Sequence, residues 1–524
     1  MAGEFVEHFP RGIGDPDGDI PALMRWARAS DIPDKYAYRD GHIFLGRAAD
    51  GRLVGIDDNR HHAVIAGSRA GKNLTVIWPN LCLYPGSCIC LDPKGENAAL
   101  TAARRGKGSA YCEGMGQRVY ILDPFGTVPN HSTASFNPLD IVEVETEAGR
   151  RLATDNAAML ADAIVMRGNE KDPHWDESAR QLISALILHV ATTEPPARRN
   201  LVRVYELLTQ GDTCAAEELS SEDEKLSDPL LALLARMEDN EAFGGAISGM
   251  AVRLASMGAT ERGSVLSTAS RNTRFLESPP MQDVLKSTSE GLKLEALKSA
   301  PEGMTIYLCL PASRMATHQR WMRIMIALSL AAMERERTPA RHPVLFLLDE
   351  MPTLGAMDAI STAAGLMAGY GVKLLFVMQD LSQLQHLYEK TWETFLGNAG
   401  CLQFFGNTDI TTLDHIGRRL GQTKVIEVSE SETTGQRGSS ASYSSKVVEL
   451  LQPAEARYLF SRERGNQLVL IADELPWALE RVPHLDPFFH GKRDWAQGYG
   501  DAPPTLENLR RRTVEEPKKR GWFR

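Results

Sequence analysis

The segment 66–73 has the composition of a loop that binds phosphate groups. It reads Ala-Gly-Ser-Arg-Ala-Gly-Lys-Asn, follows a short apolar run and precedes a helix-like stretch. Small residues let several backbone N–H groups approach one phosphate at the start of a helix, and Lys72 adds a positive charge for the β- and γ-phosphate oxygens. The residues that we expect to contact the nucleotide are Gly67, Ser68, Arg69, Ala70, Gly71, Lys72, Asn73 and Leu74.

Two positions of this segment depart from the standard phosphate-loop pattern. Ala66 replaces the first glycine, and Asn73 stands where a serine or threonine usually binds Mg²⁺. The Asn73 side chain offers a neutral carbonyl oxygen, which Mg²⁺ can use in place of a hydroxyl group. Taken alone, the motif leaves a second interpretation open, which is an ordinary Gly-Lys turn.

A second segment, residues 343–350, supplies the carboxylates that a nucleotide site needs. It reads Pro-Val-Leu-Phe-Leu-Leu-Asp-Glu, an apolar strand with two acidic residues at its carboxyl end. Ligands bind at this end of the strands in open α/β sheets. We expect Asp349 to hold Mg²⁺, directly or through water, and Glu350 to polarise the attacking water. An ordinary strand ending in acidic residues is the alternative, but the two motifs together favour an ATP and Mg²⁺ site.

A third polar residue, Gln379, follows the apolar run 374–378. Its neutral side chain can hydrogen-bond to the γ-phosphate and so respond when hydrolysis removes it. The alternative is a polar residue that only caps the end of the strand. We therefore expect Lys72, Glu350 and Gln379 to be the catalytic residues, with Asn73 and Asp349 as the ligands of Mg²⁺.

The segment 92–97, Asp-Pro-Lys-Gly-Glu-Asn, ends another apolar strand at the same edge. Lys94 and Glu96 are candidates for contacts with a neighbouring subunit, with nucleotide or with substrate. The alternative is a solvated loop in which Asn97 caps the next helix.

The histidine and cysteine pattern favours no metal site. His174 has no second histidine or cysteine at ligand spacing, so we expect a surface or capping role for it, and a packing role for Trp175. The seven cysteines are scattered, which fits a reducing compartment.

Short apolar runs separated by helical stretches predict the elements that position these residues. Unbroken apolar strands of this kind indicate a mainly parallel sheet covered on both faces, and hence an α/β fold. The predicted strands are residues 63–66, 87–91, 119–122, 305–310, 344–348, 374–378, 401–405 and 467–471.

The chain divides at the points where this pattern changes. The strand pattern stops between residues 142 and 292, where helix-period stretches predict an inserted all-α domain. The predicted division is a lead at 1–55, a motor domain in two parts at 56–141 and 293–490, the inserted domain at 142–292 and a basic tail at 491–524. We assign no catalytic or binding role to the Ser/Gly-rich stretch 429–445, which we expect to be a mobile loop or linker. The basic cluster after residue 501 is expected to be a solvated tail or a contact for anionic lipid or an acidic partner.

Charge and hydropathy limit the classes of function. The formal net charge of −10 argues against a surface that coats nucleic acid, so any DNA contact must be local. No apolar run reaches the length of a membrane span, since the best candidate, residues 324–333, covers about half of one. The amino terminus has no signal-peptide core, so we expect a soluble chain.

Several ordered segments together resemble the coupling proteins of type IV secretion, the TraG/TraD group, over residues 25–486. The resemblance includes the phosphate loop, the Gln379 region and the segments 92–97, 137–139, 174–180, 348–352, 382–384, 406–409 and 420–423. It implies a RecA-like P-loop NTPase motor domain with an inserted all-α domain, assembled as a ring, usually a hexamer, with nucleotide between subunits. It also implies a cargo of relaxase-bound single-stranded DNA or effector proteins, which ATP hydrolysis delivers to the inner-membrane secretion channel.

Two departures from the family pattern affect this expectation. Relatives commonly carry two membrane spans before the segment that resembles residues 26–28, so this sequence is either a truncated form or a member held at the membrane by partners. Relatives often place an arginine that reaches the neighbouring subunit's site where Ala368 stands. Together with Asn73, this predicts slow or partner-dependent hydrolysis.

The leading hypothesis is an ATP-driven coupling motor of a type IV secretion or conjugation system, peripheral at the cytoplasmic face of the inner membrane. Two alternatives stay open at this point. One is a nucleotide-responsive docking scaffold with weak ATPase activity, and the other is a DNA translocase of the FtsK type.

Overall fold

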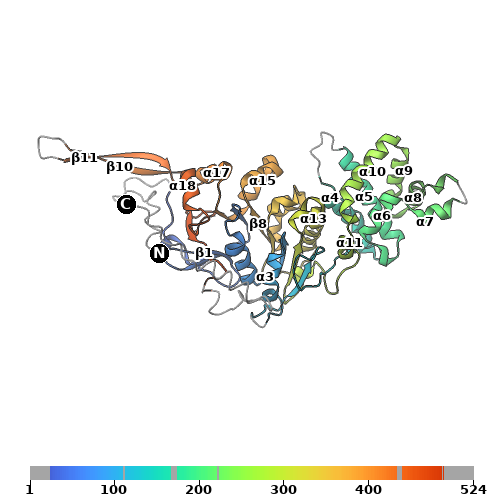
Figure 1. Cartoon of the computed structure of the whole chain (residues 1–524), viewed down its shortest axis with the longest axis horizontal. Helices are drawn as coiled ribbons and strands as arrows, with labels where there is room; N and C mark the ends of the chain where they lie inside the picture. The colour runs from blue at the N-terminus through green and yellow to red at the C-terminus, as the bar shows by residue number, and fades with distance from the viewer. Residues whose placement is uncertain are drawn as a thin grey trace.

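The central feature of the protein is a sheet of eleven strands in the order β2-β1-β13-β12-β9-β3-β8-β7-β4-β6-β5 (Figure 1). The computed structural model describes residues 24–109, 112–166, 174–220, 224–432 and 439–484, together with Asp486 and Phe488. The basic tail expected at residues 491–524 lies outside the described residues, and so do residues 1–23 of the predicted lead.

Seven neighbouring strands of this sheet are parallel, which confirms the expected α/β fold with a mainly parallel sheet. Each contains one of the apolar runs that the sequence shows, because a strand covered on both faces has no solvent side to keep polar. They are β3 (His61–Ala66), β4 (Cys88–Asp92), β5 (Arg118–Leu122), β6 (Met304–Cys309), β7 (Val344–Leu348), β8 (Val372–Met378) and β9 (Ala399–Phe405).

Four strands extend the sheet in antiparallel fashion beyond β9. β12 (Asn466–Ile471) pairs antiparallel with β9, and β13 (Trp477–Glu480), β1 (Ile43–Arg47) and β2 (Leu53–Ile56) follow. The sequence predicted β12 as one of the parallel strands, and this orientation was wrong, because an apolar run fixes burial but not direction. β1 also brings residues 43–47, which the sequence assigned to the lead, into the main sheet.

Two apolar cores lie on the two faces of the parallel strands, since neighbouring residues of one strand point in opposite directions. Ile89 and Leu91 belong to the core beneath the long helix α13, whereas Cys88 and Cys90 belong to the core beneath α2 and α3. The helices around the main sheet are α2 (Trp78–Leu83), α3 (Glu96–Arg105), α12 (Ala296–Ser299), α13 (Ala312–Arg335), α14 (Asp358–Leu366), α15 (Leu381–Tyr388), α16 (Trp392–Gly397), α17 (Ile410–Leu420) and α18 (Pro453–Leu459).

The apolar stretch 324–333, the best span candidate in the sequence, lies inside α13 and is buried against the sheet. Across the residues that the structure describes, no helix combines the length and the apolar content needed to cross a membrane.

Between β5 and β6 the described residues form helices and turns, grouped at one end of the long axis (Figure 1). This agrees with the helical pattern of the sequence between residues 142 and 292. The helices are α4 (Glu147–Ile164), α5 (His174–Thr193), α6 (Leu201–Gln210), α7 (Thr213–Leu219), α8 (Pro229–Glu238), α9 (Ser248–Ser256), α10 (Ala259–Thr273) and α11 (Pro279–Leu285).

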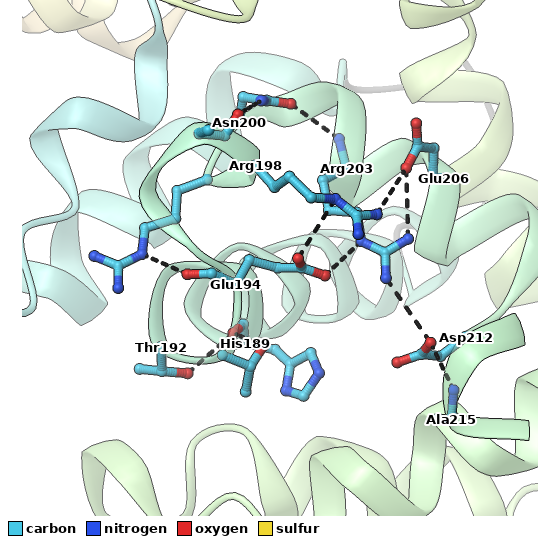
Figure 2. A network of polar contacts seen from close by, with 12 residues as sticks. His189, Thr192, Glu194, Arg198, Asn200, Arg203, Glu206, Asp212 and Ala215 are labelled. Atoms are coloured by element: carbon cyan, nitrogen blue, oxygen red, sulfur yellow. Dashed lines mark hydrogen bonds and ion pairs between the residues drawn. The ribbon is translucent and has the colours of Figure 1, made fainter. Parts of the chain in front are cut away.

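A polar network joins three helices of this group (Figure 2). Glu194, which follows α5, accepts a hydrogen bond from Arg203 Nε of α6 at 2.5 Å and lies 3.6 Å from Arg198 Nε. Arg203 Nη2 is 3.8 Å from Asp212, whose carboxylate accepts from the backbone N–H of Ala215 and so caps α7. The network therefore joins the carboxyl end of α5 to α6, and α6 to the amino end of α7.

A long hairpin projects at the opposite end of the molecule (Figure 1). It consists of β10 (Gln422–Glu432) and β11 (Ser439–Glu449), which pair residue for residue along their length. The prediction that residues 429–445 form a loop or linker was wrong for all of them except residues 433–438, which lie outside the described residues. The two strands are joined by backbone pairing, which the pattern of apolar residues, an indicator of burial, does not detect.

Candidate functional site

The three motifs predicted from the sequence meet at one edge of the sheet. The strands β3, β8, β7 and β4 are neighbours in that order and run parallel, so their carboxyl ends face the same side. The phosphate loop follows β3, Gln379 follows β8, and Asp349 and Glu350 follow β7. Parallel pairing thus brings together residues that lie about three hundred positions apart in the sequence.

Lys72 lies between the two carboxylates. Its Nζ is 3.0 Å from Asp349 Oδ1 and donates a hydrogen bond to Glu350 Oε1. Asp349 is the more enclosed partner, with 7% of its side chain exposed against 23% for Glu350. Burial lowers the pKa of Lys72, but the two carboxylates outweigh burial and hold that pKa above its ordinary value. Burial raises the pKa of Asp349, and Lys72 offsets only part of this rise.

Gln379 contacts Glu350 rather than standing alone as a strand cap. Its Nε2 donates to Glu350 Oε1 at 3.2 Å and to Oε2 at 3.3 Å. Glu350 has a φ of 54°, a left-handed conformation that is unfavourable for a residue with a Cβ atom. The backbone N–H and hydroxyl of Thr353 both donate to the Glu350 carbonyl group, at 2.8 and 2.7 Å, and hold this conformation.

The phosphate loop packs closely against the end of β9. Gly67 donates its N–H to the Phe405 carbonyl at 3.1 Å, and a Cβ atom at Gly67 would collide with the carbonyl oxygen of Gly406. On the other side of the loop, Gly71 has a φ of 90° and a Cβ there would meet nothing closer than 3.8 Å. The first glycine is thus needed for packing, and the second for the turn that leads into Lys72.

Arg481 donates a hydrogen bond to this loop, and no pattern in the sequence predicted that contact. Its guanidinium donates to the Ala70 carbonyl, to Ser461 O at 3.2 Å and to Arg462 O at 2.7 Å, and lies 4.8 Å from the Phe405 ring centroid. Burial lowers the pKa of Arg481 to about 10. The residue follows β13, more than four hundred positions from the loop, so no local motif could reveal it.

The oxygen atoms around Lys72 fit a Mg²⁺ ion. Asp349 Oδ1 is buried and, beyond its ion pair with Lys72, accepts no hydrogen bond. Asn73, directly after Lys72, turns its Nδ2 toward Asn97 Oδ1 at 3.5 Å. A carboxylate oxygen and an amide oxygen are ligands that Mg²⁺ accepts.

Comparison with known sequences places the chain in a family. Residues 25–489 match the sequence model of the family described as Type IV secretory system conjugative DNA transfer. The chain belongs to this family. It is 28% identical over 472 residues to Protein VirD4 of Agrobacterium fabrum and 26% identical over 400 residues to Conjugal transfer protein TraG of Escherichia coli. These alignments cover 87% and 72% of the chain, but only 65% and 57% of the two relatives, so the chain spans less than two thirds of their length.

Solved structures of the bacterial conjugative coupling protein TrwB have the same fold as this family member. The unbound form has a TM-score of 0.60 at 14% identity, covering 89% of this chain and 95% of TrwB. The TrwB complex with ADP and Mg²⁺ has a TM-score of 0.59 at 14% identity, covering 90% of this chain and 96% of TrwB.

The segment 92–97 lies beside the site, with Asp92 and Asn97 at its two ends buried. Asp92 is 1% exposed, and its carboxylate accepts from the backbone N–H of Ala98 at 2.8 Å. Burial raises the pKa of Asp92 to about 7. The alternative in which Asn97 caps α3 was wrong on this point, because Gly95 is the N-cap residue and Asn97 is completely buried. Lys94, by contrast, is exposed.

Two further residues singled out in the sequence lie away from this edge. Ala368 belongs to a short 3₁₀ helix (Met367–Tyr370) that precedes β8, at the opposite edge of the sheet. His174 is exposed at the start of α5, 3.9 Å from Glu261, and within the described ranges it joins no group of metal-binding side chains. Trp175 packs against the main core, as expected.

Proposed function

We propose that this protein is an ATP-driven coupling motor of a type IV secretion or conjugation system. Membership of the conjugative DNA transfer family supports the biological process. The observation that carries the proposal is the contact of Lys72 with Asp349 and Glu350 at the edge where the phosphate loop ends. In P-loop enzymes, a lysine and carboxylates at this edge handle the β- and γ-phosphates of a nucleotide.

The binding role falls to residues 67–74. Backbone N–H groups of the loop contact phosphate oxygens, and Lys72 Nζ exchanges its present carboxylate partners for the β- and γ-phosphate oxygens. Asp349 and Asn73 hold Mg²⁺, which neutralises phosphate charge when it is bound. The TrwB structures with an ATP analogue and with ADP and Mg²⁺ support the choice of ligands.

The hydrolytic role falls to Glu350 and Gln379. Once phosphate oxygens occupy Lys72, Glu350 is free to accept a proton from water while the water oxygen bonds to the γ-phosphorus and the bond to ADP breaks. Gln379, which already donates to both Glu350 oxygens, is positioned to change partner when the γ-phosphate leaves. This exchange is the link we propose between hydrolysis and movement.

The proposed cargo and assembly are those that the family resemblance implies. We propose that the chain acts as a ring of identical subunits, usually a hexamer in this family, with nucleotide between subunits. It would work at the cytoplasmic face of the inner membrane, passing relaxase-bound single-stranded DNA or effector proteins to channel components. The names of the TraG and TrwB relatives, which refer to conjugation, favour DNA.

The test is ATP hydrolysis by the purified chain with and without single-stranded DNA. We expect turnover that DNA stimulates and that Glu350→Gln reduces by about 100-fold or more. Glu238→Gln, on the exposed side of α8, is the matched control and should leave turnover unchanged. Nucleotide binding without turnover in the wild type would contradict the motor and support the docking scaffold that Asn73 and Ala368 suggest.

A further inference from the structure

We propose that Asn97 is a positioning residue that fixes the amide orientation of Asn73 and thereby determines how this site binds Mg²⁺. The inference rests on the proposed function, since it concerns the same nucleotide site. It explains how asparagine can serve where a serine or threonine is usual, and it gives a role to the buried end of the segment 92–97.

The orientation of Asn97 is fixed by Trp78. The indole Nε1–H can only donate a hydrogen bond, and it donates to Asn97 Oδ1 at 2.9 Å. The other end of the Asn97 amide, Nδ2, faces Cys90 Sγ of β4 at 3.8 Å. Because Asn97 is completely buried, turning its amide would leave the Trp78 N–H facing another donor without water to compensate.

The backbone that carries Asn97 is fixed as well. Asn97 lies in the first turn of α3, and the next residue, Ala98, donates its N–H to the buried carboxylate of Asp92. Gly95, in a left-handed conformation with a φ of 70°, makes the turn between β4 and the helix. Asn97 therefore presents an acceptor oxygen at a defined point beside the phosphate loop.

The orientation of Asn73 follows from that of Asn97. An acceptor oxygen at Asn97 selects the Nδ2 end of the Asn73 amide, which lies 3.5 Å away. Asn73 Oδ1 must then point away from Asn97, and no described residue donates a hydrogen bond to it. A hydroxyl group at position 73 would rotate freely to meet the metal, whereas an amide needs a partner to keep its oxygen, and not its nitrogen, available.

The experiment measures ATP binding with Mg²⁺ and with EDTA, by calorimetry, for the wild type and Asn97→Leu. We expect the variant to bind ATP about 10-fold more weakly when Mg²⁺ is present, and equally well when EDTA removes it. In the Asn73→Thr background, Asn97→Leu should have no effect on the Mg²⁺-dependent part of binding, because a threonine hydroxyl does not depend on Asn97.

A second variant keeps the test decisive if Asn97→Leu does not fold. Trp78→Phe keeps the ring but removes the N–H that fixes Asn97, so we expect weaker binding in the same Mg²⁺-dependent way. Trp392→Phe, a half-buried tryptophan of α16, is the matched control and should bind like the wild type.

The outcomes separate this inference from the proposed function. A wild type that binds no ATP under either condition would overturn the proposed function and the inference with it. A wild type that binds ATP with Mg²⁺, together with Trp78→Phe and Asn97→Leu variants that bind equally well, would overturn the inference alone. Weaker binding that persists in EDTA would also overturn it, since the effect would then not involve Mg²⁺.

Discussion

At the scale of single residues, the site depends on one cation held between two carboxylates of unequal burial. Lys72 contacts both Asp349 and Glu350, and it is the main group that offsets the effect of burial on the pKa of Asp349. Lys72 could be found in the sequence from the composition of the phosphate loop, and Asp349, Glu350 and Gln379 because they follow apolar runs. Arg481 could not be found, because its role depends on a contact with Ala70 that only the folded chain creates.

Replacement of Lys72 by methionine tests the cation directly. We expect Lys72→Met to reduce ATP hydrolysis by about 100-fold or more, because the positive charge that meets the phosphate oxygens is lost. The variant should also be less stable at neutral pH than at pH 5, because Asp349 then lacks its counter-charge and gains stability from protonation. Hydrolysis at the wild-type rate would show that the nucleotide does not use Lys72.

The buried carboxyl group of Asp92 predicts a pH effect on stability. Its pKa of about 7 lies above that of an aspartate in the unfolded chain, so the folded state binds the extra proton between about pH 4 and pH 7. The stability contributed by this proton is present at low pH and is lost as pH rises through 7. Asp92→Asn, which can still accept from Ala98 N–H, removes that loss.

The measurement is urea unfolding of the wild type and Asp92→Asn between pH 5 and pH 8. The free energy of unfolding of the variant, relative to the wild type, should rise by about 2–3 kcal/mol over this range. A difference that does not change with pH would show that Asp92 is not protonated in the folded state.

Arg481, which follows β13, joins the phosphate loop to the segment that follows α18. We expect Arg481→Met to weaken ATP binding by about 10-fold, since the Ala70, Ser461 and Arg462 carbonyl groups lose a shared donor and the loop loses its support. Arg464→Met, which removes an exposed guanidinium stacked on Tyr458, is the control. Equal ATP affinity in both variants would contradict this role.

At the scale of elements, the strands that position the site were predicted and several others were not. Strands inside the parallel part of the sheet, such as β7, are continuous apolar runs because both of their faces are buried, whereas β5, at the edge of the sheet, begins with the exposed Arg118. The antiparallel strands are less uniformly buried: in β13 (Trp-Ala-Leu-Glu) the two buried positions alternate with one half-buried and one exposed position. Their direction, like that of β12, depends on the path of the connecting chain and not on composition.

The β10–β11 hairpin predicts that part of the chain can be removed without loss of the fold. Its base is anchored through the buried residues Thr423 and Leu450, whereas Val447 is already 47% exposed. Replacing residues 426–445 with Asn-Gly would join Val425 to Lys446, which are paired in the ladder, by a two-residue turn. Thermal unfolding of the shortened chain should occur within about 2 °C of the wild type. A fall of about 5 °C or more would show that the hairpin supports the body.

At the scale of the whole molecule, the chain is a mainly parallel α/β sheet domain with a helical unit between β5 and β6. The change from strand to helix pattern was visible in the sequence between residues 142 and 292. The assembly was not visible, because contacts between subunits leave no periodic pattern in one chain. Ala368 lies at the edge of the sheet opposite to the site.

The most direct test of the central claim is a single-turnover experiment with radiolabelled ATP on Glu350→Gln and the wild type. We expect both proteins to bind ATP with similar affinity, the wild type to convert it to ADP, and the variant to retain it unhydrolysed. This result would assign hydrolysis, but not ATP binding, to Glu350. Conversion to ADP by Glu350→Gln at the wild-type rate would contradict the account, because the catalytic base would then lie elsewhere.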